Sequence, residues 1–447
     1  MTENSSSSSD SRYFKFLRGA DTTSPDLDWQ KGPEMVRKAL NDALNARNFA
    51  FLMGAGCSSH RPEGSELGIA TMSELAKEFC SASLAPPEVA AEQSDEWDDI
   101  GDKKSTDDDQ LAWALSPAEI EYLVQVGVDL TATEYSRNLE RLLELLHSLL
   151  FVLQRSNKPA QQSRATEISA IIEKVQRFLL ERCSKGAFSN GDHSVRTIYE
   201  VFYRKLVLRD RSLPRPWIFT TNYDLFNEVA MDRLGLPYAN GFSGVIERRF
   251  NPATFRYALA EQLDVTSRKW SAVDGFVYLC KLHGSISWTE DDHGLFPIRE
   301  RWPFDASSKV MIFPTPAKQN ASLGSPYADL IREFQSRLVR EQSVLITVGY
   351  RFGDQHLNNI IYQALTVPTF RLIVFADPNS DGEIAKLRGL SDPRIWIIGG
   401  DGPTVGSKAH YFDTVVEHFM PQRPIERVDE AVQKVLEIMG SSKDKAS

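Results

Sequence analysis

Cysteine is scarce in this chain, and long apolar runs are missing. Among 447 residues the cysteines are Cys57, Cys80, Cys183 and Cys280, and no two lie close enough to form the paired-cysteine motif of a zinc site. So few thiols in so long a chain do not suggest a disulfide framework, which indicates a reducing, cytoplasmic compartment. No apolar run approaches the roughly 18–20 residues that cross a bilayer, so we do not expect a membrane protein.

Basic charge is also in short supply. The chain carries 51 Lys and Arg against 61 Asp and Glu, a formal net charge of −10, so direct nucleic-acid binding over a broad surface is not expected. Residues 1–12 are polar and rich in serine and lack the apolar segment of a secretory signal. We therefore expect them to form a disordered tail.

Short apolar runs alternate with helical patterns from Pro214 onward. The apolar runs that predict strands are 49–53, 217–220, 277–282, 310–313, 343–348, 371–376 and 394–398. The helical patterns are 32–47, a segment from Ser73 where Thr71 and Glu74 have capping-box spacing, 136–154, 165–183, 194–208, 224–234, 327–341, 355–365 and 425–438. Continuous apolar strands between helices are typical of a parallel sheet covered on both faces, so the sequence predicts an α/β fold.

A block of helical patterns interrupts this alternation. Residues 81–213 contain the helical patterns at 136–154, 165–183 and 194–208. They also contain a strongly acidic stretch, 92–109, which is expected to be a solvated surface loop. The block is therefore predicted to be a helical insertion into an α/β domain that comprises 13–80 and 214–422. Residues 423–447 are predicted to form a C-terminal helix and tail.

The segment Gly54-Ala55-Gly56 follows the first predicted strand of the sheet. Glycines at this place let the backbone approach a diphosphate, and the N–H groups of the turn can bind it. An ordinary tight turn explains the same residues. The chain has no GxxxxGK[ST] segment, which disfavours a P-loop ATPase.

Two further polar motifs, Thr220-Thr221-Asn222-Tyr223-Asp224 and Lys281-Leu282-His283-Gly284, follow the strands at 217–220 and 277–282. Ligands of open α/β sheets bind at the carboxyl ends of the strands, so Asn222 and Asp224 would project into a crevice, although both residue types also cap helices. His283 beside a glycine suits a general base, whereas most single histidines are structural or lie on the surface.

The last two motifs follow the strands at 343–348 and 371–376. Gly349 suits a loop pressed against a ligand, and Asp354 would bind the ligand or cap the next helix. Asp377 would accept hydrogen bonds from an adenosine ribose or form an Asp-Pro turn. Five such motifs at the strand ends of one sheet are improbable as independent accidents, so we predict one ligand-binding edge.

Together the motifs resemble the sirtuin family, in its bacterial sirtuin-like branch of anti-phage defence. The residues that carry the resemblance are Gly54–Ser58, Gly68–Thr71, Thr220–Asp224, Lys281–Gly284 and Gly349–Asp354. The resemblance covers about 49–80 and 214–400 and leaves out the helical insertion. It implies a Rossmann-like sheet that binds NAD in an extended cleft.

The resemblance also implies roles for individual residues. Asn222 would orient the nicotinamide ribose and a water, His283 would act as the general base at that ribose, and Asp224 would shape the nicotinamide pocket. The loop from Gly54 to Ser58 would hold the diphosphate. The residues predicted to bind NAD are Gly54, Ala55, Gly56, Ser58, Thr221, Gly349, Asp354 and Asp377.

Two departures distinguish the chain from sirtuin deacylases. It lacks the cysteines of their zinc ribbon, so no zinc is expected, and Ala70 replaces the family proline, with no Asp-Phe-Arg segment after it. Both departures favour the NAD hydrolases of the family. These enzymes deplete NAD in infected cells and so abort the phage infection. An NAD-dependent protein deacylase and a non-enzymatic sensor or scaffold that binds NAD or ADP-ribose are the alternatives.

Unrestrained NAD hydrolysis would kill the host, so such an enzyme must be held inactive until it is needed. The resemblance points to control by assembly. We expect a homo-oligomer, with a HerA-type hexameric ATPase as the partner.

Overall fold

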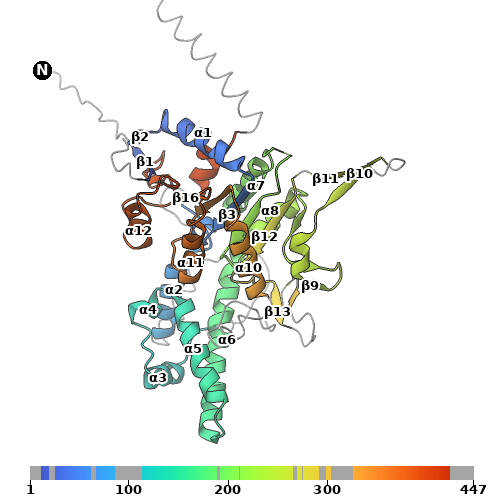
Figure 1. Ribbon diagram of the computed structural model, residues 1–447. Coiled ribbons are helices and arrows are strands. Elements are labelled where there is room, and N and C mark those ends of the chain that lie inside the picture. The colour runs from blue at the N-terminus through green and yellow to red at the C-terminus, as the bar shows by residue number, and fades with distance from the viewer. Residues whose placement is uncertain are drawn as a thin grey trace, which may run out of the picture.

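The computed structural model describes residues 12–19, 26–61, 67–85, 113–188, 192–210, 212–264, 269–273, 275–290, 298–303 and 326–422. Its main sheet contains β1 (Tyr13–Arg18), β2 (Leu27–Asp28), β3 (Asn48–Met53), β6 (Trp217–Thr220), β7 (Tyr238–Ala239), β12 (Val277–Lys281), β15 (Ser343–Val348), β16 (Arg371–Phe375) and β17 (Ile395–Gly400). The strand order is β2-β1-β17-β16-β15-β3-β6-β12-β7, and only β1 and β2 run antiparallel to their neighbours. Figure 1 labels β1, β2, β3, β12 and β16 of this sheet among the surrounding helices. The predicted α/β fold with a Rossmann-like parallel sheet is confirmed.

Helices pack on both faces of this sheet. One face carries α1 (Gly32–Leu44), α7 (Ser194–Leu206), α8 (Phe226–Arg233), α13 (Phe412–Thr414) and the π-helical turn η5 (Val415–Phe419). The other carries α10 (Tyr327–Leu338), α11 (Gln355–Ala364) and α12 (Glu383–Gly389). Side chains of β3 alternate between the two cores, with Phe51 and Met53 in the first and Ala50 and Leu52 in the second. Burial on both faces explains why the strands read as continuous apolar runs.

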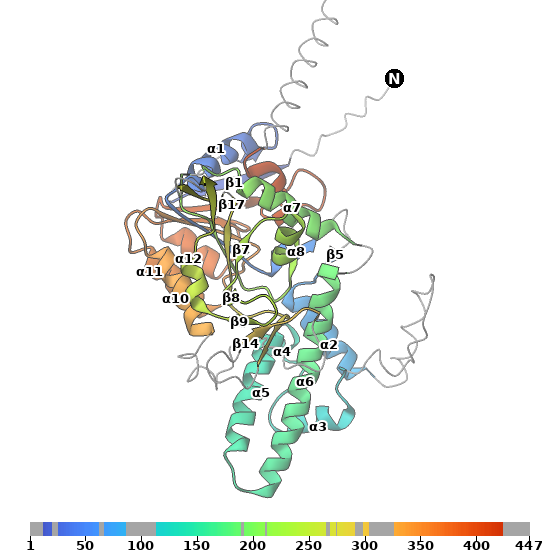
Figure 2. The same cartoon turned by 90° about the vertical axis from the view of Figure 1, so that its right-hand side faces the viewer.

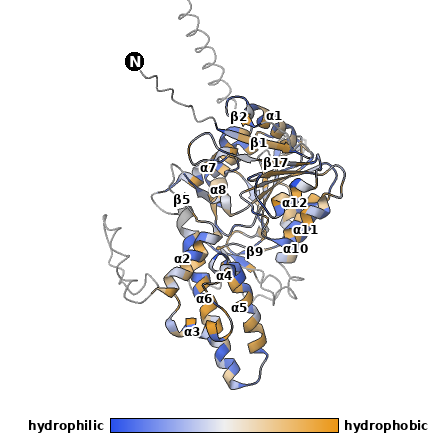
Figure 3. Cartoon of the chain, turned by 90° about the vertical axis from the view of Figure 1, so that its left-hand side faces the viewer, coloured by the Kyte–Doolittle hydropathy of each residue, from blue (hydrophilic) through white to orange (hydrophobic). Residues whose placement is uncertain are grey.

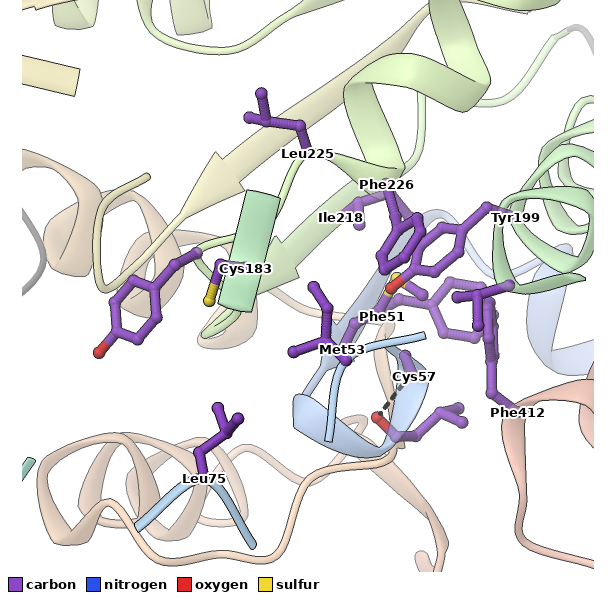
Figure 4. Packing of buried hydrophobic residues seen from close by; sticks show 14 of the residues in the cluster. Phe51, Met53, Cys57, Leu75, Cys183, Tyr199, Ile218, Leu225, Phe226 and Phe412 are labelled. Carbon is purple, nitrogen blue, oxygen red and sulfur yellow. Dashed lines mark hydrogen bonds between the residues drawn. The ribbon is translucent and has the colours of Figure 1, made fainter. Parts of the chain in front are cut away.

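Aromatic side chains fill the core next to the end of β3. Phe51 meets Phe202 of α7 edge to face at 5.0 Å between ring centroids. Tyr199 of α7 stacks on Phe226 of α8 at 5.6 Å and meets Phe412 at 5.0 Å, as Figure 4 shows. Although α7 lies within the predicted insertion, these contacts pack it against the sheet.

The remaining helices of the insertion form an arm that projects from the sheet (Figure 2). It contains α3 (Pro117–Gln125), α4 (Thr133–Ser136), α5 (Leu139–Gln154) and α6 (Pro159–Phe188), and it packs against α2 (Met72–Leu84). The long helices α5 and α6 lie side by side and bury Leu142, Leu146 and Ile171 between and beneath them. Figure 3 shows largely apolar colouring on α5 and a hydrophilic turn between α5 and α6.

Most predicted elements agree with the structure, and several helix limits differ from the predicted ones. Thr71 precedes α2 as predicted, but its side chain makes no capping bond, so the predicted capping box is wrong. Instead its carbonyl accepts from the N–H groups of Glu74 and Leu75. The helix predicted at 136–154 begins at Leu139, because the Asn138 side chain caps it.

Other helices end or begin away from their predicted limits. The helix predicted at 165–183 is α6, which spans 30 residues.

The predictions for 1–11, 92–109, 310–313 and 425–438 lie outside the described residues.

Several short elements are absent from the prediction. A four-stranded sheet has the order β13 (Trp288–Glu290), β14 (Ile298–Glu300), β9 (Arg248–Phe250) and β8 (Phe242–Ser243). A hairpin pairs β10 (Ala260–Asp264) with β11 (Lys269–Ala272), and a small one pairs β4 (Ser59–His60) with β5 (Leu67–Gly68). Within the part of the chain that the structure describes, no helix is both long and apolar enough to cross a membrane.

Candidate functional site

The register of the sheet places four strand ends in one line. Val348 of β15 pairs with Met53 of β3, Met53 pairs with Thr220 of β6, and Thr220 pairs with Lys281 of β12. The predicted motifs after these strands therefore leave the sheet at the same level. Because the strands are parallel, their carboxyl ends meet at one edge, where ligands of such sheets bind.

The loops after β3 and β15 are pressed together through glycines. The N–H of Gly54 donates to Val348 O at 3.0 Å, and the N–H of Gly56 donates to Gly349 O at 3.0 Å. A Cβ atom added to Gly54 would lie 2.5 Å from Gly349 O. Gly349 has φ +64°, and a Cβ there would lie 2.6 Å from the N atom of Cys57. These glycines allow two protein loops to approach each other.

The same contacts occupy the N–H groups of the loop after β3. Besides Gly54 and Gly56, Cys57 donates to Gly54 O at 2.9 Å and Ser58 donates to Ala55 O at 3.0 Å in the single turn η1 (Ala55–Cys57). The Cys57 thiol donates to Val348 O at 3.2 Å (Figure 4). Four N–H groups of the predicted diphosphate loop thus bind protein carbonyls.

Asn222, Ser58 and Asp224 form a buried hydrogen-bond chain. The Asn222 Nδ2 donates to Gly54 O at 2.9 Å and to Ser58 Oγ at 2.7 Å, and Ser58 Oγ donates to Asp224 Oδ2 at 2.5 Å. Both amide hydrogens of Asn222 are therefore used within the protein. Its carbonyl oxygen Oδ1 is the atom with which this side chain can bind a ligand, and it can only accept.

Asp224 and Lys281 fix the turn that carries Asn222. The second carboxylate oxygen of Asp224 accepts from Phe226 N at 3.1 Å at the start of α8. The Lys281 ammonium donates to the carbonyl oxygens of Tyr223 (3.3 Å) and Asp224 and to Glu228 Oε1 (3.0 Å).

The Lys281–Glu228 pair is almost wholly enclosed. The two side chains are 1% and 8% exposed. Burial raises the pKa of Glu228 to about 7, although the charge of Lys281 acts in the opposite direction.

His283 forms a pair with Asp354. Its Nε2 lies 3.0 Å from Asp354 Oδ2, while Asp354 Oδ1 accepts from His356 N at 2.8 Å and Leu357 N at 3.1 Å as the N-cap of α11. Asp354 is thus a helix cap and a histidine partner together. A carboxylate can only accept, so this contact places the hydrogen of a neutral imidazole on Nε2 and leaves Nδ1 as the basic nitrogen.

A residue that sequence reasoning missed, Glu140 of α5, reaches the same histidine. Its Oε1 accepts from the Tyr223 hydroxyl at 2.8 Å and lies 3.9 Å from His283 Nδ1. Nothing in the sequence distinguishes Glu140 from Glu144 on the same helix, because both read as polar positions of an amphipathic pattern.

The two carboxylates raise the pKa of the histidine. Burial lowers the pKa of His283, but the hydrogen bond with Asp354 and the negative charges of Glu140 and Asp354 outweigh it, so the pKa lies above its ordinary value. Burial alone would raise the pKa of Asp354. The contact with His283 and the hydrogen bonds from two backbone N–H groups outweigh burial, so this pKa lies below its ordinary value.

Two predicted residues contribute differently. Thr221 donates its backbone N–H to Met53 O at 3.1 Å and so links the ends of β6 and β3. Asp377 follows β16 and is exposed, and its Oδ1 accepts from Asn379 N at 2.9 Å within an Asp-Pro turn. Its role toward a ribose stays a prediction.

The cysteines form no disulfide within the described residues. All four cysteines are buried and free. In the described ranges, no group of three or more His, Cys, Asp or Glu side chains is placed to hold a metal ion.

Comparison with known protein families gives one finding. Residues 216–388 match the model of a family described as the SIR2-like domain. This part of the chain is similar to that domain. The matched stretch is less than half of the chain and contains Asn222, His283 and Asp354, whereas the loop after β3 lies outside it. No curated protein matches the chain. The SIR2-like match supports an NAD-related activity in general terms.

Proposed function

We propose that the protein is an NAD hydrolase that cleaves the N-glycosidic bond between nicotinamide and ribose. The observation that carries the proposal is the juxtaposition of Asn222 and the His283–Asp354 pair at one sheet edge. An amide oxygen that can only accept and a histidine with a basic nitrogen are suited to hold a ribose and a water. The similarity of 216–388 to the SIR2-like domain supports NAD as the substrate.

In the proposed reaction the C1′–N bond breaks and its electron pair leaves with nicotinamide, which departs as a neutral molecule. Positive charge develops on the ribose as an oxocarbenium-like centre, and the oxygen of a water adds to C1′. Asn222 Oδ1 accepts a hydrogen bond from this water or from the 2′-hydroxyl. His283 takes a proton from the water or from a ribose hydroxyl. Correct placement of these groups contributes several kcal/mol, on the order of what oriented reactants provide.

The residues present fit the nicotinamide-ribose end of NAD better than the diphosphate end. Asn222 and His283 follow the neighbouring strands β6 and β12, whereas the N–H groups of Gly54, Gly56, Cys57 and Ser58 already bind protein carbonyls. We therefore assign the nicotinamide ribose to the edge formed by β6 and β12. The assignment of the glycine loop to the diphosphate remains a prediction.

Control by assembly is a further part of the proposal, and burial of the site supports it. Asn222, Asp224 and His283 are only 6%, 3% and 9% exposed, and the arm contacts the site through Glu140. NAD must reach nearly covered side chains, so part of their cover has to move. We propose that a homo-oligomer, or a HerA-type hexameric ATPase bound to it, controls this movement.

The resemblance to defence proteins supports a role in abortive infection. In that role, cleavage would empty an infected cell of NAD before phage are released. Cells that carry the chain should lose NAD after infection and yield fewer phage, and cells that carry His283→Ala should do neither. Normal phage yield with an active chain would contradict this role.

Nicotinamide release from NAD tests the enzymatic proposal. We expect release by the purified chain, alone or with an added HerA-type ATPase, and we expect Asn222→Ala and His283→Ala to abolish it while the chain stays folded. Release in His283→Ala equal to that of the unaltered chain would contradict the assignment. Release that depends strictly on an acyl-lysine peptide would indicate a deacylase, and NAD binding without turnover would indicate a sensor or scaffold.

A further inference from the structure

We propose that Glu140, which belongs to the helical arm, is a positioning residue for His283: it lies on the opposite side of the imidazole from Asp354 and stabilises the ring when Nδ1 takes a proton. The inference rests on the proposed function, in which His283 is the base. It adds a residue from the arm to a site that otherwise comes from the strand ends of the sheet.

The first step is the geometry of the carboxylate. Glu140 Oε1 accepts from the Tyr223 hydroxyl at 2.8 Å, and Tyr223 adjoins Asn222 in the turn after β6. The same oxygen lies 3.9 Å from His283 Nδ1, while Asp354 binds Nε2 at 3.0 Å. The two carboxylates therefore face the two nitrogens of one ring.

The second step is that the backbone beneath Glu140 is fixed. The N–H of Glu140 donates to Asn138 Oδ1 at 2.9 Å in the cap of α5. Its neighbours Leu139 and Leu142 are completely buried. Glu140 thus occupies its place because α5 is anchored there, and a movement of the arm would carry the carboxylate with it.

The third step concerns the charges around the ring. Asp354 and Glu140 are the groups whose charges act on His283. The hydroxyls of Tyr223 and Tyr350 lie in the same region and stay neutral, because burial raises the pKa of each far above its ordinary value. The Lys281 ammonium, two residues before His283, binds Glu228 and the backbone of the turn.

Glu140 is the more exposed of the two carboxylates, with a side chain 37% exposed against 27% for Asp354. Asp354 caps α11 and is held by two backbone N–H groups, whereas Glu140 comes from the arm and its side chain is 37% exposed. Water and salt screen an exposed charge, so its effect on the histidine is modest and depends on ionic strength. Through Glu140 the arm thereby contributes to how strongly His283 binds a proton.

The test is a pH titration of the His283 ring by NMR in the full chain without NAD, with the resonance assigned by its loss in His283→Ala. Glu140→Gln keeps an acceptor for Tyr223 and removes the charge, so we expect the pKa of His283 to fall by about half to one pH unit. The control is Glu144→Gln, since Glu144 lies one turn along α5 and pairs with Arg141 at 2.6 Å. We expect no shift in the control.

An unchanged His283 titration in Glu140→Gln would overturn the inference, and so would an equal shift in Glu144→Gln. In turnover, Glu140→Gln should move the acidic limb of the kcat/KM profile, which reports the enzyme without NAD, to lower pH by the same amount. The titration uses no NAD. If it shifts as expected but the chain does not turn over NAD, the result would count against the proposed function alone. Normal turnover with an unshifted titration would count against the role of Glu140 alone.

Discussion

His283 Nε2 and Asp354 Oδ2 lie 3.0 Å apart, although the two residues follow strands that are not neighbours in the sheet. His283 follows β12 and Asp354 follows β15, and β3 and β6 run between these strands. The pair therefore spans the ends of β3 and β6, from which Gly54 and Asn222 emerge. This contact fixes which nitrogen of His283 carries the hydrogen and which is basic.

Asp354→Asn tests the importance of that contact. An asparagine oxygen can still cap α11, but an amide facing Nε2 can donate, which would favour the other tautomer and take the lone pair from Nδ1. We expect nicotinamide release to fall by about 100-fold or more, as when a catalytic histidine is held in the wrong tautomer, with little change in the melting temperature. Asp381→Asn, an exposed position, is the matched control. Unchanged release in Asp354→Asn would show that the pair is only structural.

Turnover should depend on the protonation of His283. Burial lowers its pKa, but the two neighbouring carboxylates outweigh burial and place the pKa above 6.5. The base must be neutral, so the rate should rise with pH and reach half of its maximum above pH 6.5. A rate that is constant from pH 5.5 to 8 would contradict the role of His283 as the base.

The raised pKa of His283 also links folding to pH. A group that binds a proton more tightly in the folded state stabilises that state fully below its unfolded pKa and loses the contribution as pH rises through the folded pKa. The free energy of unfolding should therefore fall between pH 6 and pH 8 by more in the unaltered chain than in His283→Ala. Denaturant titrations at both pH values measure the difference. An equal fall in both proteins would argue against the pairing.

Lys281→Met should destabilise the fold. It leaves the Glu228 carboxyl group buried without its partner and removes the ammonium donor to the Asp224 carbonyl, which should cost about 3–5 kcal/mol of unfolding free energy. Adding Glu228→Gln removes the unpaired charge and should restore a large part of the loss. Denaturant unfolding of the single and double variants measures both effects. A double variant as unstable as the single one would show that packing, and not charge, is responsible.

Gly349→Ala should force apart the loops that follow β3 and β15. The position has φ +64°, and a Cβ would lie 2.6 Å from Cys57 N. The backbone conformation alone costs about 1–2 kcal/mol for a residue with a side chain, and the close contact adds to it. We expect lower stability and lower turnover, measured by thermal unfolding and nicotinamide release. Gly389→Ala has open space around it and should leave both unchanged.

The sequence predicts the central sheet well, because strands that are buried on both faces appear as continuous apolar runs. The runs at 217–220 and 343–348 are strands with the predicted limits, and the others differ by one or two residues where they are described. Local capping is predicted less reliably. Thr71 and Asn138 both precede helices, yet only the Asn138 side chain caps its helix.

The contacts of the site are harder to predict than its position. The motifs predict that Asn222 and His283 lie at the same edge of the sheet. They do not predict that Asn222 donates both amide hydrogens to Gly54 and Ser58. The contact of Glu140 depends on how the arm folds back on the sheet, over a long stretch of intervening chain. A periodic pattern shows which face of a helix is apolar. It does not predict which polar residue of that helix contacts a distant loop.

Product analysis in water enriched in oxygen-18 tests the central claim most directly. The chain is given NAD and no peptide, with and without an added HerA-type ATPase, and the products are identified by mass spectrometry. The account predicts one nicotinamide for each ADP-ribose, with one solvent oxygen in the ADP-ribose, and neither product with His283→Ala. NAD that stays bound and intact, or ADP-ribose that forms only with an acyl-lysine peptide and carries its acyl group, would contradict it.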